Sequence, residues 1–371
     1  MRIIQTVPIF NDLGELYTRQ GKYALAEPLL KRGLEIREKT LLADRHLFAV
    51  AIVAAAFCFA GLAGYTPVWF TLITVCVFGG PHNYCEFRYF LSRLPSRFGP
   101  LRAFFTTAFA GAIILCLLEI GLTRLYVRNA VSTSAARMAL LSWNELLILW
   151  MFALSILRYR SRFNSVGSLV TEHSPYLAVA TAANILSAPG FSLALTYLHP
   201  LLGLWVLERE LRRTRKSWVK SYHWCLLSIP IALTALICIM SQSSGDRPSD
   251  HLVGALNGNI VGSQLFPNAS SSMLLAIFGF LQMVHYGVWV IAIPLANQSW
   301  KRWRIDRLPV LTSKPAFRPI VVAVCILGVL AILYFWCGYI VDYDHVNEIY
   351  ITLATLHAVA EVPFMFWMCE S

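Results

Sequence analysis

Two histidine–glutamate pairs are the residues in this sequence best suited to chemistry. His82 and Glu86 form the first pair, and His357 and Glu361 form the second. Residues four apart lie on one face of an α-helix, so each pair can present an imidazole and a carboxylate to the same point. Neutral imidazole is the commonest metal ligand, and carboxylates often complete the coordination shell. The two pairs therefore indicate a metal site to which two helices contribute.

Two further histidines, His199 and His285, lie in other apolar segments. The cysteines form no C-x-x-C pair and mostly lie inside apolar segments, so they are expected to be small buried hydrophobes. We predict a metal centre of non-haem iron or a di-metal type, with a haem held by two histidines as the alternative. The predicted metal ligands are His82, His199, His285 and His357, and the predicted catalytic carboxylates are Glu86 and Glu361.

The same residues admit other interpretations. His285 and His357 could be neutral histidines hydrogen-bonded to a neighbouring helix, and Glu86 could be hydrated at a membrane interface. Glu361 is harder to explain in this way, because a carboxylate buried in hydrocarbon needs a metal, a cation or a proton. A proton or substrate relay in a transporter therefore remains a second functional interpretation.

The composition indicates that these residues are positioned by membrane helices. Of the 371 residues, 57% are hydrophobic and 14% are charged, whereas soluble domains carry about 25% charged residues. The apolar residues gather in blocks of about the length that crosses a bilayer. We predict an all-α, polytopic transmembrane helix bundle of about 10 spans. The predicted spans are 47–63, 67–84, 103–123, 138–157, 174–188, 190–207, 222–241, 271–296, 318–340 and 348–369.

Basic residues predict the orientation of these spans. With both termini in the cytoplasm, the inner connections 85–102, 158–173, 208–221 and 297–318 hold nineteen Lys and Arg residues, and the outer connections hold four. Short cytoplasmic loops are enriched in Lys and Arg, so this asymmetry favours an even number of crossings. All six candidate site residues then lie on even-numbered spans, in the middle or cytoplasmic half. Glu208, Glu210, Asn144 and Glu145 are further polar residues on those spans.

The sequence pattern of residues 8–40 predicts a helical hairpin, because apolar positions recur at helical spacing on both sides of Gly21. The segment resembles one tetratricopeptide repeat of the kinesin-light-chain type. The matching positions are Leu13, Gly14, Tyr17, Gly21, Tyr23, Ala26, Glu27, Leu30 and the closing KRGLEIREK, and the departures are Gly33 and Glu38.

One repeat cannot bury its own hydrophobic face, because repeat arrays gain stability by stacking neighbours. The hairpin is therefore either a docking element for a protein partner or the remnant of a longer array. We expect two domains, a cytoplasmic hairpin at 1–45 and a multi-span membrane domain at 46–371.

The membrane region is loosely similar to the Brp/Blh family of membrane carotenoid-cleaving dioxygenases. The similarity depends on His82 after Gly80-Pro81 and on histidines spread over several spans, and the sequence departs from the family at Asn83-Tyr84-Cys85. The resemblance implies iron held by intramembrane histidines.

The formal charge of +11 does not indicate nucleic-acid binding, because the basic residues form short clusters between apolar blocks. We therefore predict an integral membrane protein with an intramembrane His/Glu metal site. The expected activity is an oxygen-dependent oxidation of a lipid or isoprenoid. The alternatives are haem-based electron transfer and a transporter or scaffold that uses the hairpin 8–40 to bind a partner.

Overall fold

The computed structural model describes residues 12–13, 15–95, 99–127, 132–160, 166–242, 270–297, 308–313 and 315–368. All regular secondary structure in these residues is helical, which confirms the all-α class. The long helices are α2 (Tyr23–Tyr65), α4 (Gly79–Arg93), α5 (Arg102–Val127), α6 (Thr133–Tyr159), α7 (Val166–Leu186), α8 (Ala188–Thr214), α10 (Ser228–Gln242), α13 (Ser271–Gly287), α16 (Arg318–Val341) and α17 (Tyr343–Met368).

Shorter helical segments connect or extend the long helices. They are α3 (Pro67–Ile73), α9 (Val219–Leu226), α14 (Ile293–Ala296), α15 (Pro309–Ser313), the 3-10 turns Gly99–Leu101, Lys216–Trp218 and Pro315–Phe317, and the π-helical turns Thr74–Phe78 and Val288–Ala292. One π-turn joins α3 to α4, and the other joins α13 to α14.

Seven helical segments among the described residues are long and apolar enough to cross a membrane. They are Arg45–Tyr65, Arg102–Leu122, Ser134–Tyr159, Ala188–Thr214, Lys216–Gln242, Ser272–Ala296 and Pro315–Gly338. The predicted number of about ten spans is therefore not confirmed.

Two further predicted spans, 67–84 and 174–188, do not meet this test, and the predicted span 348–369 extends beyond the described residues, so the test does not cover it. The first is divided by the π-turn Thr74–Phe78 and ends in the charged helix α4. Polar side chains such as Asn184 on α7 lower the hydropathy of the second.

Helix α16 carries the clearest evidence for a lipid environment. It exposes large apolar side chains on several faces, including Ile320, Leu327, Leu330 and Leu333. None of the residues in its most apolar stretch is buried inside the protein. Exposed apolar surface of this extent marks contact with lipid or another apolar partner, so α16 has the exterior of a membrane helix.

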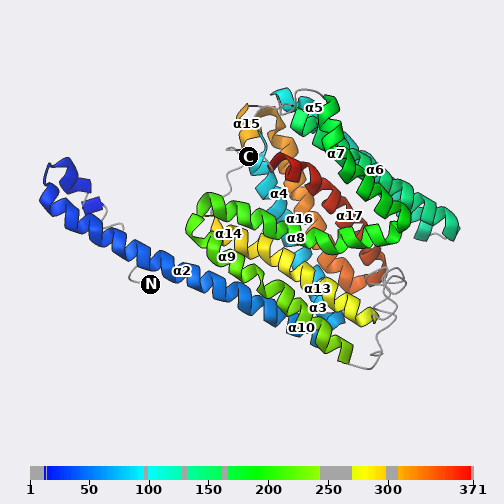
Figure 1. The fold of residues 1–371 in the computed structure, drawn as a ribbon, viewed down its shortest axis with the longest axis horizontal. Coiled ribbons are helices and arrows are strands. Elements are labelled where there is room, and N and C mark those ends of the chain that lie inside the picture. Colours follow the sequence, from blue (N-terminus) through cyan, green and yellow to red (C-terminus); the bar gives the residue numbers. More distant parts are fainter. Residues whose placement is uncertain are drawn as a thin grey trace.

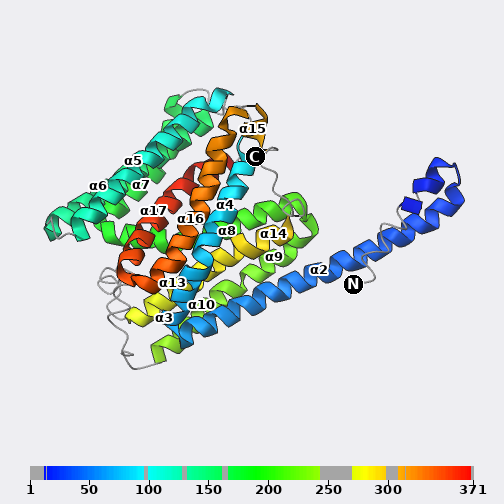
Figure 2. The ribbon, with the colours of Figure 1, turned by 180° about the vertical axis from the view of Figure 1, so that it is seen from behind.

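The N-terminal part of α2 extends away from the bundle as an arm (Figures 1 and 2). A turn at Gly21, where φ is +72°, precedes α2 and folds the helical residues 15–19 back beside it. Residues 8–11 and 14 of the predicted hairpin lie outside the described residues. The predicted domain boundary at residues 45/46 falls within α2, so the arm and the first membrane-length segment form one continuous helix.

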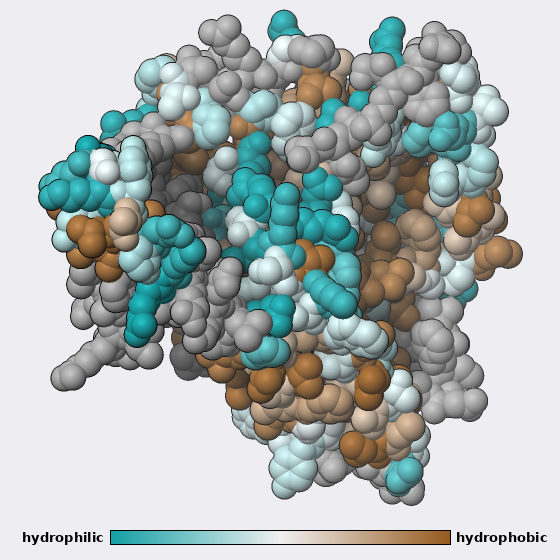
Figure 3. All heavy atoms as spheres, turned by 60° about the vertical axis from the view of Figure 1, so that its left-hand side comes forward, coloured by the Kyte–Doolittle hydropathy of each residue, from teal (hydrophilic) through white to brown (hydrophobic). Residues whose placement is uncertain are grey.

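The bundle buries large aromatic side chains where α4, α8 and α13 meet. Tyr89, Phe90 and Trp289 pack edge to face, with ring centroids 5.5–5.8 Å apart. This packing holds α4 beside the π-turn that follows α13. On the outside of the molecule, Figure 3 shows hydrophobic side chains over the lower part of one face and hydrophilic side chains concentrated above them.

Adding one methyl group is expected to have opposite effects on stability at two glycines of α5. A Cβ at Gly111 would overlap the Trp150 indole, which donates a 3.0 Å hydrogen bond to the Thr107 carbonyl, whereas a Cβ at Gly121 meets nothing within 4 Å. We expect Gly111→Ala to destabilise the protein by about 1–3 kcal/mol through overpacking. Gly121→Ala is the matched control and should be neutral or stabilising by up to about 1 kcal/mol. Thermal unfolding of both variants in detergent measures the difference, and equal melting temperatures would contradict the α5–α6 packing.

Candidate metal centre

The structure brings all six predicted site residues together. His82 and Glu86 lie on α4, His199 on α8, His285 on α13, and the pair at 357 and 361 on α17. They form two overlapping groups in which one ligand atom from each residue lies within 4.8 Å of the others. The first group is His82, Glu86, His285 and His357, and the second is His199, His285, His357 and Glu361.

The ring of His82 is oriented by its own helix and by a neighbouring aromatic ring. Its Nδ1 lies 2.6 Å from the Gly79 carbonyl and donates to it, so Nε2 carries the lone pair that can bind a ligand. That Nε2 lies 3.2 Å from Nε2 of His357. Tyr286 stacks on the His82 ring with centroids 4.1 Å apart. These contacts aim Nε2 of His82 at the centre of the cluster.

His285 is oriented in the same way by another helix. Its Nδ1 lies 3.2 Å from the Pro200 carbonyl on α8, which accepts the ring proton. The opposite nitrogen, Nε2, is fully buried and has no hydrogen-bond partner. A backbone carbonyl on one ring nitrogen and an open lone pair on the other is the usual arrangement of a metal-binding histidine.

The two carboxylates of the cluster are buried, with exposed fractions of 2% for Glu86 and 3% for Glu361. Oε2 of Glu86 lies 3.0 Å from Nε2 of His357. Oε2 of Glu361 lies 3.1 Å from Nδ1 of His199, and Oε1 lies 3.5 Å from Nε2 of His357. None of these three oxygens makes a hydrogen bond of acceptable geometry. Burying an unpaired carboxylate costs several kcal/mol, so the cluster requires a cation or protons.

The spacing of the ligand atoms suits a single ion or a closely spaced pair. Two atoms bound about 2.1 Å from one ion lie about 3.0–3.4 Å apart in octahedral or tetrahedral geometry. The observed separations between neighbouring ligand atoms, 3.0–3.5 Å, cover this range. Four imidazoles and two carboxylates form a donor set typical of iron, manganese or zinc. The residues present therefore fit a transition metal.

Both π-helical turns lie next to the centre. Thr74–Phe78 directly precedes Gly79, whose carbonyl orients His82, and Val288–Ala292 begins three residues after His285. π-Turns inside α-helices are rare and often occur at functional sites, because the extra residue changes the direction of the side chains beyond it. Hydropathy and helical spacing contain no signal for such turns, and the sequence did not predict them.

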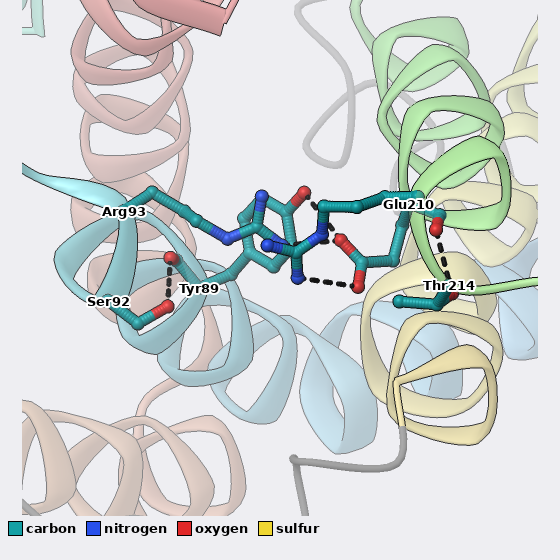
Figure 4. Close-up of polar contacts among 6 residues, drawn as sticks. Tyr89, Ser92, Arg93, Glu210 and Thr214 are labelled. Atoms are coloured by element: carbon teal, nitrogen blue, oxygen red, sulfur yellow. Dashed lines mark hydrogen bonds and ion pairs between the residues drawn. The ribbon is translucent and has the colours of Figure 1, made fainter. Parts of the chain in front are cut away.

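Glu210, which the sequence grouped with the candidate residues, belongs to a separate cluster that joins α4 to α8 (Figure 4). Its carboxylate is fully buried and pairs with Arg93, accepts from Tyr89 Oη at 3.2 Å and lies 3.1 Å from Arg213. The Arg93 guanidinium also lies 4.4 Å from the centroid of the Tyr89 ring. This cluster positions the two helices that carry His82, Glu86 and His199, and it does not contribute ligands.

Asn144 and Glu145 form a second separate cluster, between α6, α7 and α8. Asn144 donates to Asn184 at 2.9 Å and accepts from Ser192 at 3.0 Å. Glu145 accepts from Thr181 at 2.7 Å and from Asn184 at 3.2 Å. Because these side chains provide one another's hydrogen-bond partners, the cluster acts as a helix–helix contact.

Gly203 is a residue of the centre that the sequence did not single out. A Cβ at this position would lie 3.0 Å from Nδ1 of His285, where α8 passes the ring. We expect Gly203→Ala to push the imidazole away from Pro200 and to weaken metal binding about 10–100-fold, the usual effect of disturbing a residue that orients a ligand. Metal titration of the purified variant measures this. The control is Gly121→Ala, and equal affinities in the two variants would contradict the close approach of α8 to His285.

Comparisons with protein-family models, with curated proteins and with solved structures find no match for this chain. Its class is therefore defined by the fold and the cluster. It is an all-α protein with several membrane-length apolar helices and a buried group of histidines and glutamates that could hold a metal ion.

Proposed function

We propose that this chain is a multi-pass membrane oxidoreductase with a transition-metal centre held by His82, His199, His285 and His357. The observation that carries the proposal is the convergence of buried acceptor atoms that lack hydrogen-bond partners, namely Nε2 of His285, Oε2 of Glu86 and both oxygens of Glu361. Such atoms are costly to bury unless a cation neutralises them. Non-haem iron is the proposed metal, because imidazole and carboxylate ligands suit it and thiolates are not part of the cluster.

Haem is the less favoured cofactor. The ligand atoms of each group lie within 4.8 Å of one another and come from several directions, which suits a bare ion better than the plane of a macrocycle. Bound iron would supply oxygen-dependent oxidation of an apolar substrate. In this proposal Glu86 and Glu361 hold or accept protons at their carboxylate oxygens, and the aromatic residues packed around His285 exclude water.

The substrate class follows from the surroundings of the centre. The helices that carry it pack among membrane-length apolar helices, so a substrate dissolved in the bilayer has the shortest route to it. We therefore propose a lipid or isoprenoid substrate. We retain the ten-span arrangement with cytoplasmic termini as part of the proposal, because the distribution of Lys and Arg favours it.

We also propose that the hairpin 8–40, with its similarity to one tetratricopeptide repeat, binds a protein partner. Leu16, Tyr23 and Leu25 are exposed on the arm, where the bundle does not cover them. Truncation of residues 1–21 tests this, since it should abolish the partner's binding while leaving the metal content unchanged.

The function is tested by elemental analysis and visible absorption of detergent-purified protein, followed by oxygen uptake with bilayer-soluble isoprenoids. About one or two equivalents of iron, weak visible absorption and substrate-dependent oxygen uptake are expected. A strong visible band would instead identify haem. Colourless protein that binds no added iron would overturn the oxidoreductase and favour a protonatable His/Glu relay in a transporter.

A further inference from the structure

A groove lies between α8 and the helices α9 and α10, away from the metal centre. It encloses about 330 Å³ and is lined by Leu201, Leu204, Trp205, Leu226, Ile229 and Pro230, with Glu208 at one end. Both walls belong to the membrane-length segments Ala188–Thr214 and Lys216–Gln242. An apolar groove between two such helices is accessible to the acyl chains of the bilayer.

The groove and the metal centre lie on opposite faces of α8. Leu201, Leu204 and Glu208 follow one another at helical spacing on one face, while Gly203 contacts His285 from the other. Leu201 is 39% exposed, which agrees with an outward-facing wall. A ligand in this groove would therefore not touch the metal ligands, and its binding is independent of the proposed metal chemistry.

The polar end of the groove combines an open acceptor with cationic groups. Oε1 of Glu208 accepts from Arg212 at 2.6 and 2.9 Å and from His223 at 2.9 Å. No described residue donates to the other oxygen, Oε2, and the side chain is 24% exposed. The Arg209 guanidinium lies 5.2 Å from the centroid of the ring of Trp205, which lines the groove. The end of the groove thus offers an acceptor for a cationic donor, with the Arg212 guanidinium on the same carboxylate and the Arg209 guanidinium over Trp205.

The geometry points to one occupant, a phospholipid whose headgroup carries both a phosphate and a primary ammonium, as in phosphatidylethanolamine. An acyl chain lies along the apolar walls, the ammonium donates to Oε2 of Glu208, and the phosphate is bound by Arg209 and Arg212. A trimethylated headgroup has no N–H to donate to Glu208, and a glycerol headgroup lacks the positive charge. The site therefore discriminates among phospholipids with identical chains.

Native mass spectrometry of delipidated full-length protein tests this inference, with phosphatidylethanolamine, phosphatidylcholine and phosphatidylglycerol of matched chains as probes. We expect phosphatidylethanolamine to bind about tenfold more tightly than the other two, the contribution of one charge-assisted hydrogen bond. Glu208→Gln should reduce its affinity to that of phosphatidylcholine, because the amide still accepts from Arg212 but carries no charge.

Two further variants locate the site. Leu201→Trp should fill the exposed groove and weaken all three lipids, whereas Glu172→Gln, at an exposed glutamate of α7, should change none of them. Equal binding of the three headgroups by wild-type protein, a preference for phosphatidylglycerol, or unchanged binding in Leu201→Trp would overturn the inference. Metal content is measured in parallel and should be the same in all variants, so failure of the lipid site is distinguished from failure of the metal centre.

Discussion

Replacing His285 and His357 together by alanine is expected to abolish metal binding. These two histidines belong to both overlapping groups, so their loss leaves each group with one histidine and one glutamate. Two ligands cannot hold a transition metal against water and chelating buffer, since protein sites supply three or four. We expect about one or two equivalents of metal in the wild type and less than about a tenth of that in the variant.

The measurement is elemental analysis of protein purified from cells grown with added iron, beside metal titration of the stripped protein. The matched control is His46→Ala/His173→Ala, which removes two histidines outside the cluster and should keep the full metal content. Metal that persists in His285→Ala/His357→Ala would place the binding site elsewhere. Metal lost equally from both double variants would indicate a general effect of the substitutions on folding.

Removing the metal is expected to lower the thermal stability of the wild type and to have a smaller effect on Glu361→Gln. A metal present at about a thousand times its dissociation constant stabilises the folded protein by about 4 kcal/mol. Without it, Oε2 of Glu86 and both carboxylate oxygens of Glu361 remain buried without hydrogen-bond partners. The amide of Glu361→Gln carries no charge, so the metal-free variant should be at least as stable as the metal-free wild type.

The loss of one carboxylate should also weaken metal binding about 10–100-fold, which reduces the metal-dependent stabilisation by about 1.4–2.8 kcal/mol. Melting curves in detergent, with chelator or with added metal and at one fixed scan rate, measure both effects. Glu172→Gln is the control and should respond to metal as the wild type does. If chelator lowers the melting temperature of Glu361→Gln as much as that of the wild type, Glu361 does not contact the metal.

Hydropathy predicted most of the membrane-length helices of the fold. Seven predicted spans coincide with helices that are long and apolar enough to cross a membrane. The predicted span 67–84 does not meet that criterion, and it contains His82 and leads directly into Glu86. Polar ligand side chains lower the hydropathy of this segment, whereas the segments that carry His199 and His285 are apolar enough elsewhere to meet the criterion.

The sequence by itself determined the α-helical class, the apolar segments and the pairing of His82 with Glu86 and of His357 with Glu361, because hydrophobic length and i, i+4 spacing are local properties of the chain. Only the tertiary structure decided that α4, α8, α13 and α17 bring their polar side chains to one point, and that Glu210 and Asn144 belong to other clusters. Such contacts depend on which helices are neighbours and on close approaches such as Gly203 to His285. These features arise from packing between segments far apart in the chain, and no local pattern encodes them.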